Sequence, residues 1–402
     1  MSTSSLAIHN LRTFVIVLVL AVHSFLAYLG SSPASSFRFD DPPYQWRSIP
    51  IIDDSRWFGF DIFCAHQDVY LIALLFFLSG LFVWPSLAHK GARVFLRDRM
   101  VRIGLPFALT VGVLMPIALY PVYRVTAVDS SLEAYSQHWL ALPFWPSGPV
   151  WFLWVLLVFD FGVAALYRFA PRSGNALARI IGGLSMRPVA FVVALLVAST
   201  LAYVPLALVF TPWTWFHVGP FAFQFCRPLL YAVYFLAGLG VGAYGIERGL
   251  LAPTGWLVRH WAAAAGAAIA TFVLWLGSVQ IAMSADQPPS LAVQIFEALS
   301  FVLCCAAGCM FMLAIFIRFA GRHVRVLDAL KPHAYGMYIV HYLFSVWLQF
   351  ALLGLAIIAV VKGAIVFLVT LVLSWSSVAA FRRVSHAVGI FGPAQRSAPT
   401  AR

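Results

Sequence analysis

The sequence predicts an all-α polytopic membrane protein, and three observations lead to that fold class. The first is composition: 62% of the 402 residues are hydrophobic and 10% are charged, and the mean hydropathy is +0.90. A soluble domain carries about 25% charged residues, so this chain falls outside that class. The second is the recurrence of apolar segments long enough to cross a bilayer. The third is an uneven distribution of basic residues between alternate loops, which is typical of multi-spanning proteins.

Ten apolar segments are expected to form transmembrane helices around a central cavity. They run over residues 10–29, 69–88, 101–121, 149–169, 188–208, 228–246, 261–282, 291–318, 334–354 and 357–381. The last two are divided near Gly354, because one helix across both would be far too long to span once. We expect one membrane-embedded domain, residues 1–382, and a short cytoplasmic tail, residues 383–402, with a composition typical of disorder.

Basic residues predict the orientation of these segments. With the N-terminus in the cytoplasm, the loops on that side hold 20 of the 26 Lys and Arg residues, and the opposite loops hold most of the acids. Because cytoplasmic loops of membrane proteins are enriched in Lys and Arg, both termini are predicted to be cytoplasmic. The net charge of +12 follows from this bias, so it does not indicate a nucleic-acid partner.

The first segment carries two ionisable side chains, Arg12 and His23, eleven residues apart. That spacing is about three helical turns, so both side chains project from nearly the same face. The rise between them is roughly 16 Å, about half the thickness of the hydrocarbon core. Arg12 is therefore expected near one membrane surface and His23 near the middle, where an ionisable group indicates function. The pair predicts anion binding at the mouth of a cavity and acid–base chemistry deeper inside.

The second segment and the loop after it contain two further landmarks. Ser79 and Gly80 form a small-residue notch that predicts the close approach of another helix. Arg99 and Arg102 are three residues apart, so they share a helix face on the same membrane side as Arg12. Taken alone, the arginine pair is explained by topology-setting charge. Together with Arg12 it predicts a cationic mouth, because the planar fork of arginine suits phosphate and coenzyme A carries several phosphates.

The fourth segment begins with Gly148 and Pro149, followed by Trp151 and Trp154. This pattern indicates a helix start with an aromatic anchor at the membrane interface. Asp160 lies deeper in the same segment. Two interpretations of Asp160 stay open: a structural pair with an arginine, which we favour, and a place in the lining of the cavity.

The ninth segment carries Tyr335, Tyr338 and His341, each about one helical turn after the last. The three side chains fall on one stripe, and a polar stripe inside a membrane helix predicts that it faces a cavity. For His341, both a structural hydrogen-bonded role and a catalytic role are open.

Cysteines and outer aromatic residues favour structural interpretations. None of the cysteines has the spacing of a zinc site, so no metal is expected. Three of them cluster on one predicted helix and are interpreted as packing residues, while a disulfide between Cys64 and Cys226 is the open alternative. Aromatic residues of the outer loops, such as Trp46 and Trp57, fit an interfacial belt, and a sugar-stacking surface is the alternative.

Five landmarks, taken in this order, resemble the acyltransferase type 3 family of multi-spanning membrane acyltransferases. They are the segment from Leu11-Arg12 to His23, the Phe-Phe-Leu-Ser-Gly block ending at Gly80, Arg99-Met-Val-Arg102 before Pro106, Gly148-Pro149 with Trp151-Phe-Leu-Trp154, and the Tyr335-Gly-Met-Tyr338 segment with His341. The resemblance extends over nearly the whole chain. The chain departs from the family pattern where Asp and Gly often flank the first arginine, since Asn10 and Thr13 stand there. It also has Ala334 where Ser is common.

The resemblance implies transfer of an acyl group, usually acetyl or succinyl, from cytoplasmic acyl-CoA to a hydroxyl of a cell-envelope glycan or glycolipid. It implies that Arg12 and His23 are essential and that Arg99 and Arg102 correspond to the family's arginine pair. Expected partners are acyl-CoA as co-substrate, a carbohydrate or glycolipid acceptor and membrane lipids, without a tightly bound cofactor. The implied location is the bacterial inner membrane, and the stand-alone length is similar to that of members that modify glucans.

The predicted site therefore has two groups of residues. Catalysis is assigned to His23 and His341, and substrate binding to Arg12, Arg99, Arg102, Tyr335 and Tyr338. The pantetheine arm of acyl-CoA is long enough to cover the rise between the first arginine and the first histidine. His23 then either deprotonates the acceptor hydroxyl or takes the acyl group itself, and both mechanisms stay open.

Two other functions are compatible with parts of this pattern. A secondary transporter for a small organic anion or a sugar would also have about ten spans and ionisable residues at mid-membrane. It predicts an internal pseudo-symmetry that the sequence does not display. A haem protein with His23 and His341 as axial ligands would normally use more paired histidines. The sequence favours the acyltransferase over both.

Overall fold

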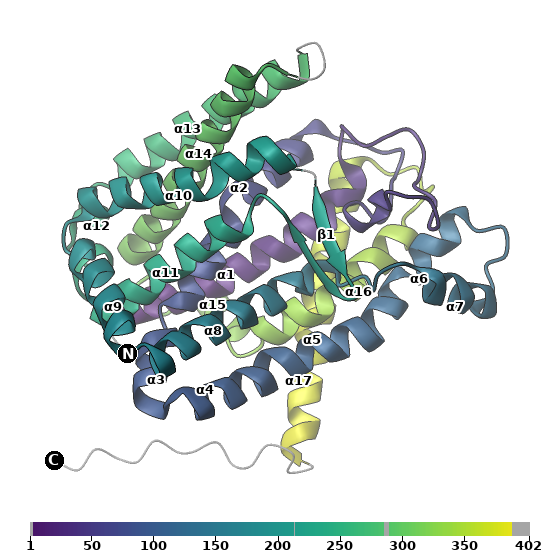
Figure 1. Ribbon diagram of the computed structural model, residues 1–402. Helices are drawn as coiled ribbons and strands as arrows, with labels where there is room; N and C mark the ends of the chain where they lie inside the picture. The colour runs from purple at the N-terminus through teal and green to yellow at the C-terminus, as the bar shows by residue number, and fades with distance from the viewer. Residues whose placement is uncertain (1–2, 213, 285–288, 388–402) are drawn as a thin grey trace.

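The computed structural model describes residues 3–212, 214–284 and 289–387, and its regular structure is almost entirely helical (Figure 1). The α-helices are α1 (Thr3–Phe25), α2 (Phe58–Gly80), α3 (Val83–Lys90), α4 (Ala92–Arg99), α5 (Leu105–Leu109), α6 (Met115–Thr126), α7 (Leu132–Ala141), α8 (Trp151–Phe169), α9 (Pro171–Ser185), α10 (Pro188–Phe210), α11 (Pro228–Tyr244), α12 (Trp256–Arg259), α13 (Trp261–Ser284), α14 (Leu291–Phe319), α15 (Arg325–Leu330), α16 (Ala334–Ala351) and α17 (Ala359–Ala387). The predicted all-α polytopic fold class is confirmed.

Shorter elements complete the chain. The 3₁₀ turns are η1 (Leu26–Tyr28), η2 (Gln45–Arg47), η5 (Gly148–Val150) and η6 (Gly249–Leu251), and the π-helical turns are η3 (Met100–Gly104) and η4 (Thr110–Leu114). The strands β1 (Trp215–Val218) and β2 (Phe221–Gln224) form one antiparallel hairpin, with Phe216 opposite Phe223. This hairpin was not predicted from the sequence.

The number of spans is the point on which the structure departs from the prediction. Within the described residues, eight helical segments are long and apolar enough to cross a membrane, or nine if one bent pair is counted. That pair is Pro228–Tyr244 and Gly249–Arg259, which meet at 83°. The remaining predicted span is α16, which buries the polar side chains of His341 and Gln349. The prediction of ten is therefore not confirmed, although a helix lies in each of the ten predicted segments.

Three helical segments begin earlier than the sequence predicted, and the first starts at Thr3 instead of residue 10. The second starts at Phe58 instead of residue 69, because Asp61, His66 and Asp68 interrupt the apolar pattern over its first turns. The third extends from Ala92 to Thr126. Its two π-helical turns each precede a proline, Pro106 or Pro116, whose missing N–H removes a backbone hydrogen bond of the regular α-helix.

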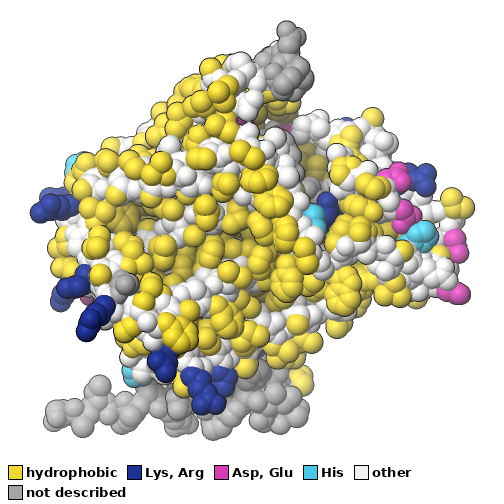
Figure 2. Space-filling model, viewed as in Figure 1, with side chains coloured by type: hydrophobic (Ala, Val, Ile, Leu, Met, Phe, Trp, Pro, Cys, Tyr) yellow, Lys and Arg dark blue, Asp and Glu magenta, His cyan; other side chains and the backbone are white. Residues whose placement is uncertain are grey.

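Burial separates the interior helices from those that face lipid. In the most apolar stretch of α14, 78% of the residues are buried, and in that of α2 the fraction is 67%. The corresponding fraction of buried residues is 11% in α13 and 17% in both α10 and α17. The outer helices therefore expose apolar side chains, which is the arrangement expected in a bilayer. Figure 2 shows a broad hydrophobic surface between the two charged ends of the molecule.

The predicted notch at Gly80 is confirmed by the packing of α2 against α11. A Cβ atom added at Gly80 would overlap the carbonyl oxygen of Phe235, and one at Gly238 would overlap that of Phe77. The same holds for Gly242 against Leu81. The two backbones are thus closer than any larger residue permits, which is the means by which small residues promote helix association in membranes.

Charges divide the molecule into two ends. At one end, which we call the basic end, the segments 83–102, 171–187, 244–259 and 318–333 come together around the N-terminus of α1. The opposite acidic end comprises the loop 29–57, α7, the β-hairpin and the turn 352–358. Figure 2 shows most Lys and Arg at the left and lower edge and Asp and Glu at the right, where a few basic side chains also lie.

Two further predictions concern the cysteines and the C-terminus. All five cysteines are free and buried, so the packing interpretation is confirmed and the alternative disulfide between Cys64 and Cys226 is not formed. The helix α17 continues to Ala387, past the predicted domain limit at 382. The rest of the predicted tail, residues 388–402, lies outside the described residues.

Candidate active site

The site is built around the C-terminal end of α1, where His23 is half-buried. The imidazole of His341, on α16, meets it there: His341 Nε2 lies 3.3 Å from His23 Nδ1, and the ring centroids are 5.0 Å apart at an angle of 61°. The two histidines predicted as catalytic are 318 residues apart in the sequence. The structure brings them into direct contact.

Backbone contacts determine which ring nitrogens carry protons when both imidazoles are neutral. His23 Nδ1 is 2.8 Å from the carbonyl oxygen of Val19, and His341 Nδ1 is 2.7 Å from that of Tyr338. A carbonyl oxygen only accepts, so both Nδ1 atoms must donate. His341 Nε2 is then an acceptor facing the His23 Nδ1–H, and the His23 Nε2 lone pair is left for another donor. This arrangement orients His23 as a base.

Gln349 supports the backbone next to His23 and was not among the predicted residues. Its Nε2 donates to the carbonyl oxygens of His23 at 2.7 Å and Ser24 at 3.2 Å. These carbonyls lie in the last turn of α1, just before η1 begins. The last carbonyls of an α-helix have no intrahelical N–H donor, so the amide of Gln349 takes that place. The ring of Tyr342 packs edge-on against His23, with centroids 5.5 Å apart. Gln349 follows His341 by about two helical turns, so the two side chains share a face of α16. That spacing could have identified Gln349 from the sequence.

The polar stripe on α16 contacts neighbouring helices, and its predicted position beside a cavity stays a prediction. Tyr335 donates its hydroxyl to the carbonyl oxygen of Arg102 at 2.7 Å, and Tyr338 donates to that of Pro149 at 2.6 Å. The carbonyl of Arg102 needs such a donor, because Pro106 has no N–H to offer it. Both hydroxyl hydrogens are therefore already used in hydrogen bonds to backbone carbonyls. The assignment of the two tyrosines to substrate binding stays a prediction.

The three predicted arginines are distributed along the basic end. Arg99 forms an ion pair with Asp160, with Nε and Oδ2 3.2 Å apart, and the Asp160 side chain is fully buried. This confirms the favoured interpretation of Asp160 as a structural partner. The charges of Arg12 and Arg99 are close enough to act on each other, while that of Arg102 acts on Asp98. Arg12 and Arg102 both have exposed side chains, and Arg12 lies over the ring of Phe82 at 5.4 Å.

Asn10, which stands where the family pattern often has Asp, has a specific structural role. Its amide Nδ2 donates to the carbonyl oxygens of Ala320 at 2.7 Å and Arg322 at 3.0 Å, just beyond the end of α14. An ionised Asp has no hydrogen to donate, so it would leave these two carbonyls without this partner. The substitution therefore fits this chain's own packing between α1 and α14.

At the acidic end, Arg47 and the β-hairpin form a second polar and aromatic cluster. Arg47 Nη1 donates to His217 Nε2 at 2.6 Å, and its guanidinium lies 4.4 Å above the ring centroid of Phe144. Burial and the neighbouring charge of Arg47 lower the pKa of His217 to about 4. At neutral pH His217 is therefore an uncharged acceptor for Arg47. The sequence indicated His217 as one of the outer-loop aromatic residues but did not predict its contact with Arg47, and the cluster presents planar rings beside a fixed cation.

Comparison with known proteins assigns the chain to a family. The family model described as an acyltransferase domain, that of the acyltransferase type 3 family, matches residues 5–379. Neither the curated proteins nor the solved structures yield a match. The matched region runs from the first turn of α1 into α17, so it includes both histidines and all three arginines of the site. The chain belongs to the acyltransferase type 3 family and is an integral, multi-pass membrane acyltransferase.

Proposed function

We propose that this protein transfers an acyl group, acetyl or succinyl, from acyl-CoA to a hydroxyl of a cell-envelope glycan or glycolipid. Family membership supports acyl transfer rather than the transporter left open by the sequence. The haem alternative is disfavoured because the two histidine rings are in contact, which leaves no room for a macrocycle between them. The observation that carries the proposal is the oriented pair of His23 and His341.

His23 is proposed as the general base. Its Nε2 accepts the proton of the acceptor hydroxyl while the hydroxyl oxygen attacks the thioester carbonyl carbon. The new C–O bond replaces the C–S bond, and the departing thiolate takes the proton back from His23. In the intermediate stage the imidazolium is stabilised through Nδ1–H by the carbonyl oxygen of Val19 and by His341 Nε2. His341 acts through His23 and is therefore a positioning residue in this scheme.

The basic end is proposed as the binding site for the phosphates of acyl-CoA. Arg12 and Arg102 have exposed side chains there, and Arg99 is held by Asp160 close to Arg12. Arginine forks bind phosphate oxygens bidentately. From Arg12 the helix rises roughly 16 Å to His23, a distance that the pantetheine arm can cover. The thioester would then lie beside the base.

The acceptor is proposed to approach from the acidic end. Phe144, His217 and Arg47 lie there, and sugars stack on aromatic rings and accept hydrogen bonds from guanidinium groups. The charge bias of the loops supports a cytoplasmic basic end in a bacterial inner membrane. The donor and acceptor would then meet at His23 from opposite sides of the bilayer.

A transfer assay with labelled donors tests the proposal. The purified protein in lipid nanodiscs is incubated with radiolabelled acetyl-CoA or succinyl-CoA and a panel of envelope glycans and glycolipids. We expect label in at least one acceptor, and we expect Arg12→Gln and Arg102→Gln to raise the KM for the donor. The control is Arg325→Gln, an exposed arginine on α15 outside the site. Unchanged KM values in both site variants, or no transfer from any CoA thioester, would contradict the proposed donor.

A further inference from the structure

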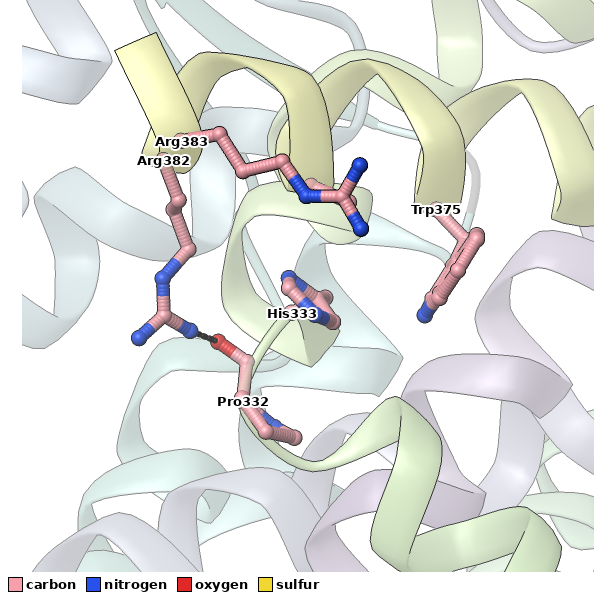
Figure 3. A pocket seen from close by; sticks show the side chains of 6 residues that line it. Pro332, His333, Trp375, Arg382 and Arg383 are labelled. Carbon is pink, nitrogen blue, oxygen red and sulfur yellow. Dashed lines mark hydrogen bonds between the residues drawn. The ribbon is translucent and has the colours of Figure 1, made fainter. Parts of the chain in front are cut away.

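A hollow of about 470 Å³ lies at the basic end, between α17 and the turn that leads into α16. Its lining is Pro332, His333, Trp375, Ala379, Arg382 and Arg383. Figure 3 shows His333 near the middle, with Arg382 at the left, the guanidinium of Arg383 above the imidazole and Trp375 at the right. None of these lining residues is acidic. The hollow therefore combines two guanidinium groups, an imidazole and an indole without a carboxylate to neutralise them.

The polar groups of the hollow are only partly used by the protein itself. Arg382 donates one hydrogen bond to the carbonyl oxygen of Pro332, and Arg383 makes no hydrogen bond or ion pair within the described part of the chain. His333 Nδ1 is buried and has no hydrogen-bond partner among the described residues. An arginine offers five N–H donors in a planar fork. The unused donors point to an anionic ligand with several acceptor oxygens.

The position of the hollow relates it to the membrane surface. Lys362, near the start of α17, pairs with Asp53 at the acidic end, and Arg382 follows it by twenty residues. That length of helix is roughly 30 Å, the thickness of a hydrocarbon core. Arg382 thus stands where α17 emerges from the opposite side of the bilayer. Val372 and Phe381 on the same helix are 59% and 64% exposed, so apolar surface leads up to the hollow.

We propose that this hollow binds the phosphate ester of an anionic membrane lipid, with Arg382 and Arg383 on the phosphate oxygens and the acyl chains along α17. A phosphodiester is a monoanion with two unesterified oxygens, which matches the forks of two adjacent arginines. Trp375 donates its indole N–H to the carbonyl oxygen of Ala329 at 3.2 Å, and its ring forms an interfacial wall. The site is separate from the proposed acyl-CoA contacts, because neither Arg12 nor Arg102 is among its lining residues.

Lipid binding by the full-length protein tests this assignment. Delipidated protein in detergent is titrated with phosphatidylglycerol, with phosphatidylcholine and with soluble glycerol phosphate, and bound species are counted by native mass spectrometry. We expect phosphatidylglycerol to bind more tightly than phosphatidylcholine, and the double variant Arg382→Gln/Arg383→Gln to weaken its binding roughly tenfold or more. The matched control is Arg325→Gln, which removes one exposed basic charge at the same end outside the hollow.

The two anion sources give different results. Arginine-dependent binding of phosphatidylglycerol alone supports the lipid, and equal arginine-dependent binding of glycerol phosphate supports a soluble phosphate ester in the same site. Since both arginines are exposed, we expect the double variant to fold, and its elution on size-exclusion chromatography verifies this. A folded double variant that binds both ligands as tightly as the wild type would overturn the proposal.

Discussion

At the scale of single residues, three polar side chains of α16 find partners on neighbouring segments. His341 meets His23, Tyr338 meets the carbonyl of Pro149, and Tyr335 meets that of Arg102. An unsatisfied polar group in a lipid environment costs several kcal/mol, so these contacts specify how α16 is placed. The contact with His341 also orients the His23 ring. Placement of the helix and orientation of the base are thus one structural feature.

The role of His341 as a positioning residue gives a kinetic prediction. His341→Ala removes one of the two acceptors of His23 Nδ1–H and leaves only the carbonyl of Val19, so we expect kcat to fall roughly tenfold or more while the KM for acyl-CoA is unchanged. His341→Gln keeps an acceptor oxygen on a side chain of similar reach and should recover part of the loss. Steady-state kinetics in nanodiscs measure both parameters, with His260→Ala, an exposed histidine, as the control. A wild-type kcat in His341→Ala would show that the contact has no catalytic effect.

Sequence patterns identified the candidate side chains but not their contacts. Arg12, His23 and His341 stand out because ionisable groups are costly in apolar helices. The contact between His23 and His341 depends on how α1 and α16 pack, and no local pattern encodes a pairing across 318 residues. The Tyr335 hydrogen bond depends in addition on a carbonyl left open by Pro106, which belongs to a different helix. Such partners follow from tertiary structure alone.

At the scale of helices, close packing between α2 and α11 provides the rigid part of the interior. Gly238 and Gly242 on α11 lie against backbone carbonyls in and just after the last turn of α2, and Gly80 on α2 lies against that of Phe235 on α11. These three positions leave no space for a methyl group. The contact is therefore expected to be sensitive to the smallest possible enlargement.

The variant Gly238→Ala tests this packing, and Gly266→Ala on α13 is its control. The added methyl group at position 238 overlaps the carbonyl oxygen of Phe77, whereas at position 266 nothing lies within 4 Å. We expect the first variant to lower the free energy of unfolding by about 1–3 kcal/mol, because overpacking displaces the neighbouring backbone. The second should show no loss. Thermal unfolding in one detergent compares the midpoints, and equal midpoints for the two variants would contradict the packing argument.

Helices were easier to predict than the elements between them. Apolar runs such as Pro188–Phe210 and Leu291–Phe319 have ends within two residues of those predicted, because hydrophobic length is a strong signal. The four-residue strands β1 and β2 are too short to show an alternating pattern, and aromatic residues dominate both faces. The early start of α2 was missed because its first turns carry polar residues that pair or hydrogen-bond at the acidic end, such as Asp61.

At the scale of the whole molecule, the separation of charge into a basic and an acidic end suggests how two substrates reach one site. The basic end carries the exposed arginines proposed to hold the donor, and the acidic end carries the aromatic cluster proposed to meet the acceptor. His23 lies in the last turn of α1, between Arg12 and the loop 29–57 of the acidic end. This division requires a fixed orientation in the membrane.

Cysteine labelling in cells tests that orientation. All five native cysteines are buried, so single introduced cysteines should dominate the signal. We expect Asp129→Cys, at the acidic end, to react with a membrane-impermeant maleimide in intact cells. Arg325→Cys, at the basic end, should react only after the cells are disrupted. The reverse pattern would place the basic end outside the cytoplasm and contradict the proposed path of acyl-CoA.

The central claim is that His23, oriented by His341, is the group that moves the proton during acyl transfer. Single-turnover transfer from bound, labelled acyl-CoA by His23→Ala measures this most directly, because donor binding and chemistry are then observed separately. The account predicts that the variant binds the donor like the wild type and transfers it slower by at least about a hundredfold. Transfer at the wild-type rate by a folded His23→Ala protein would contradict it.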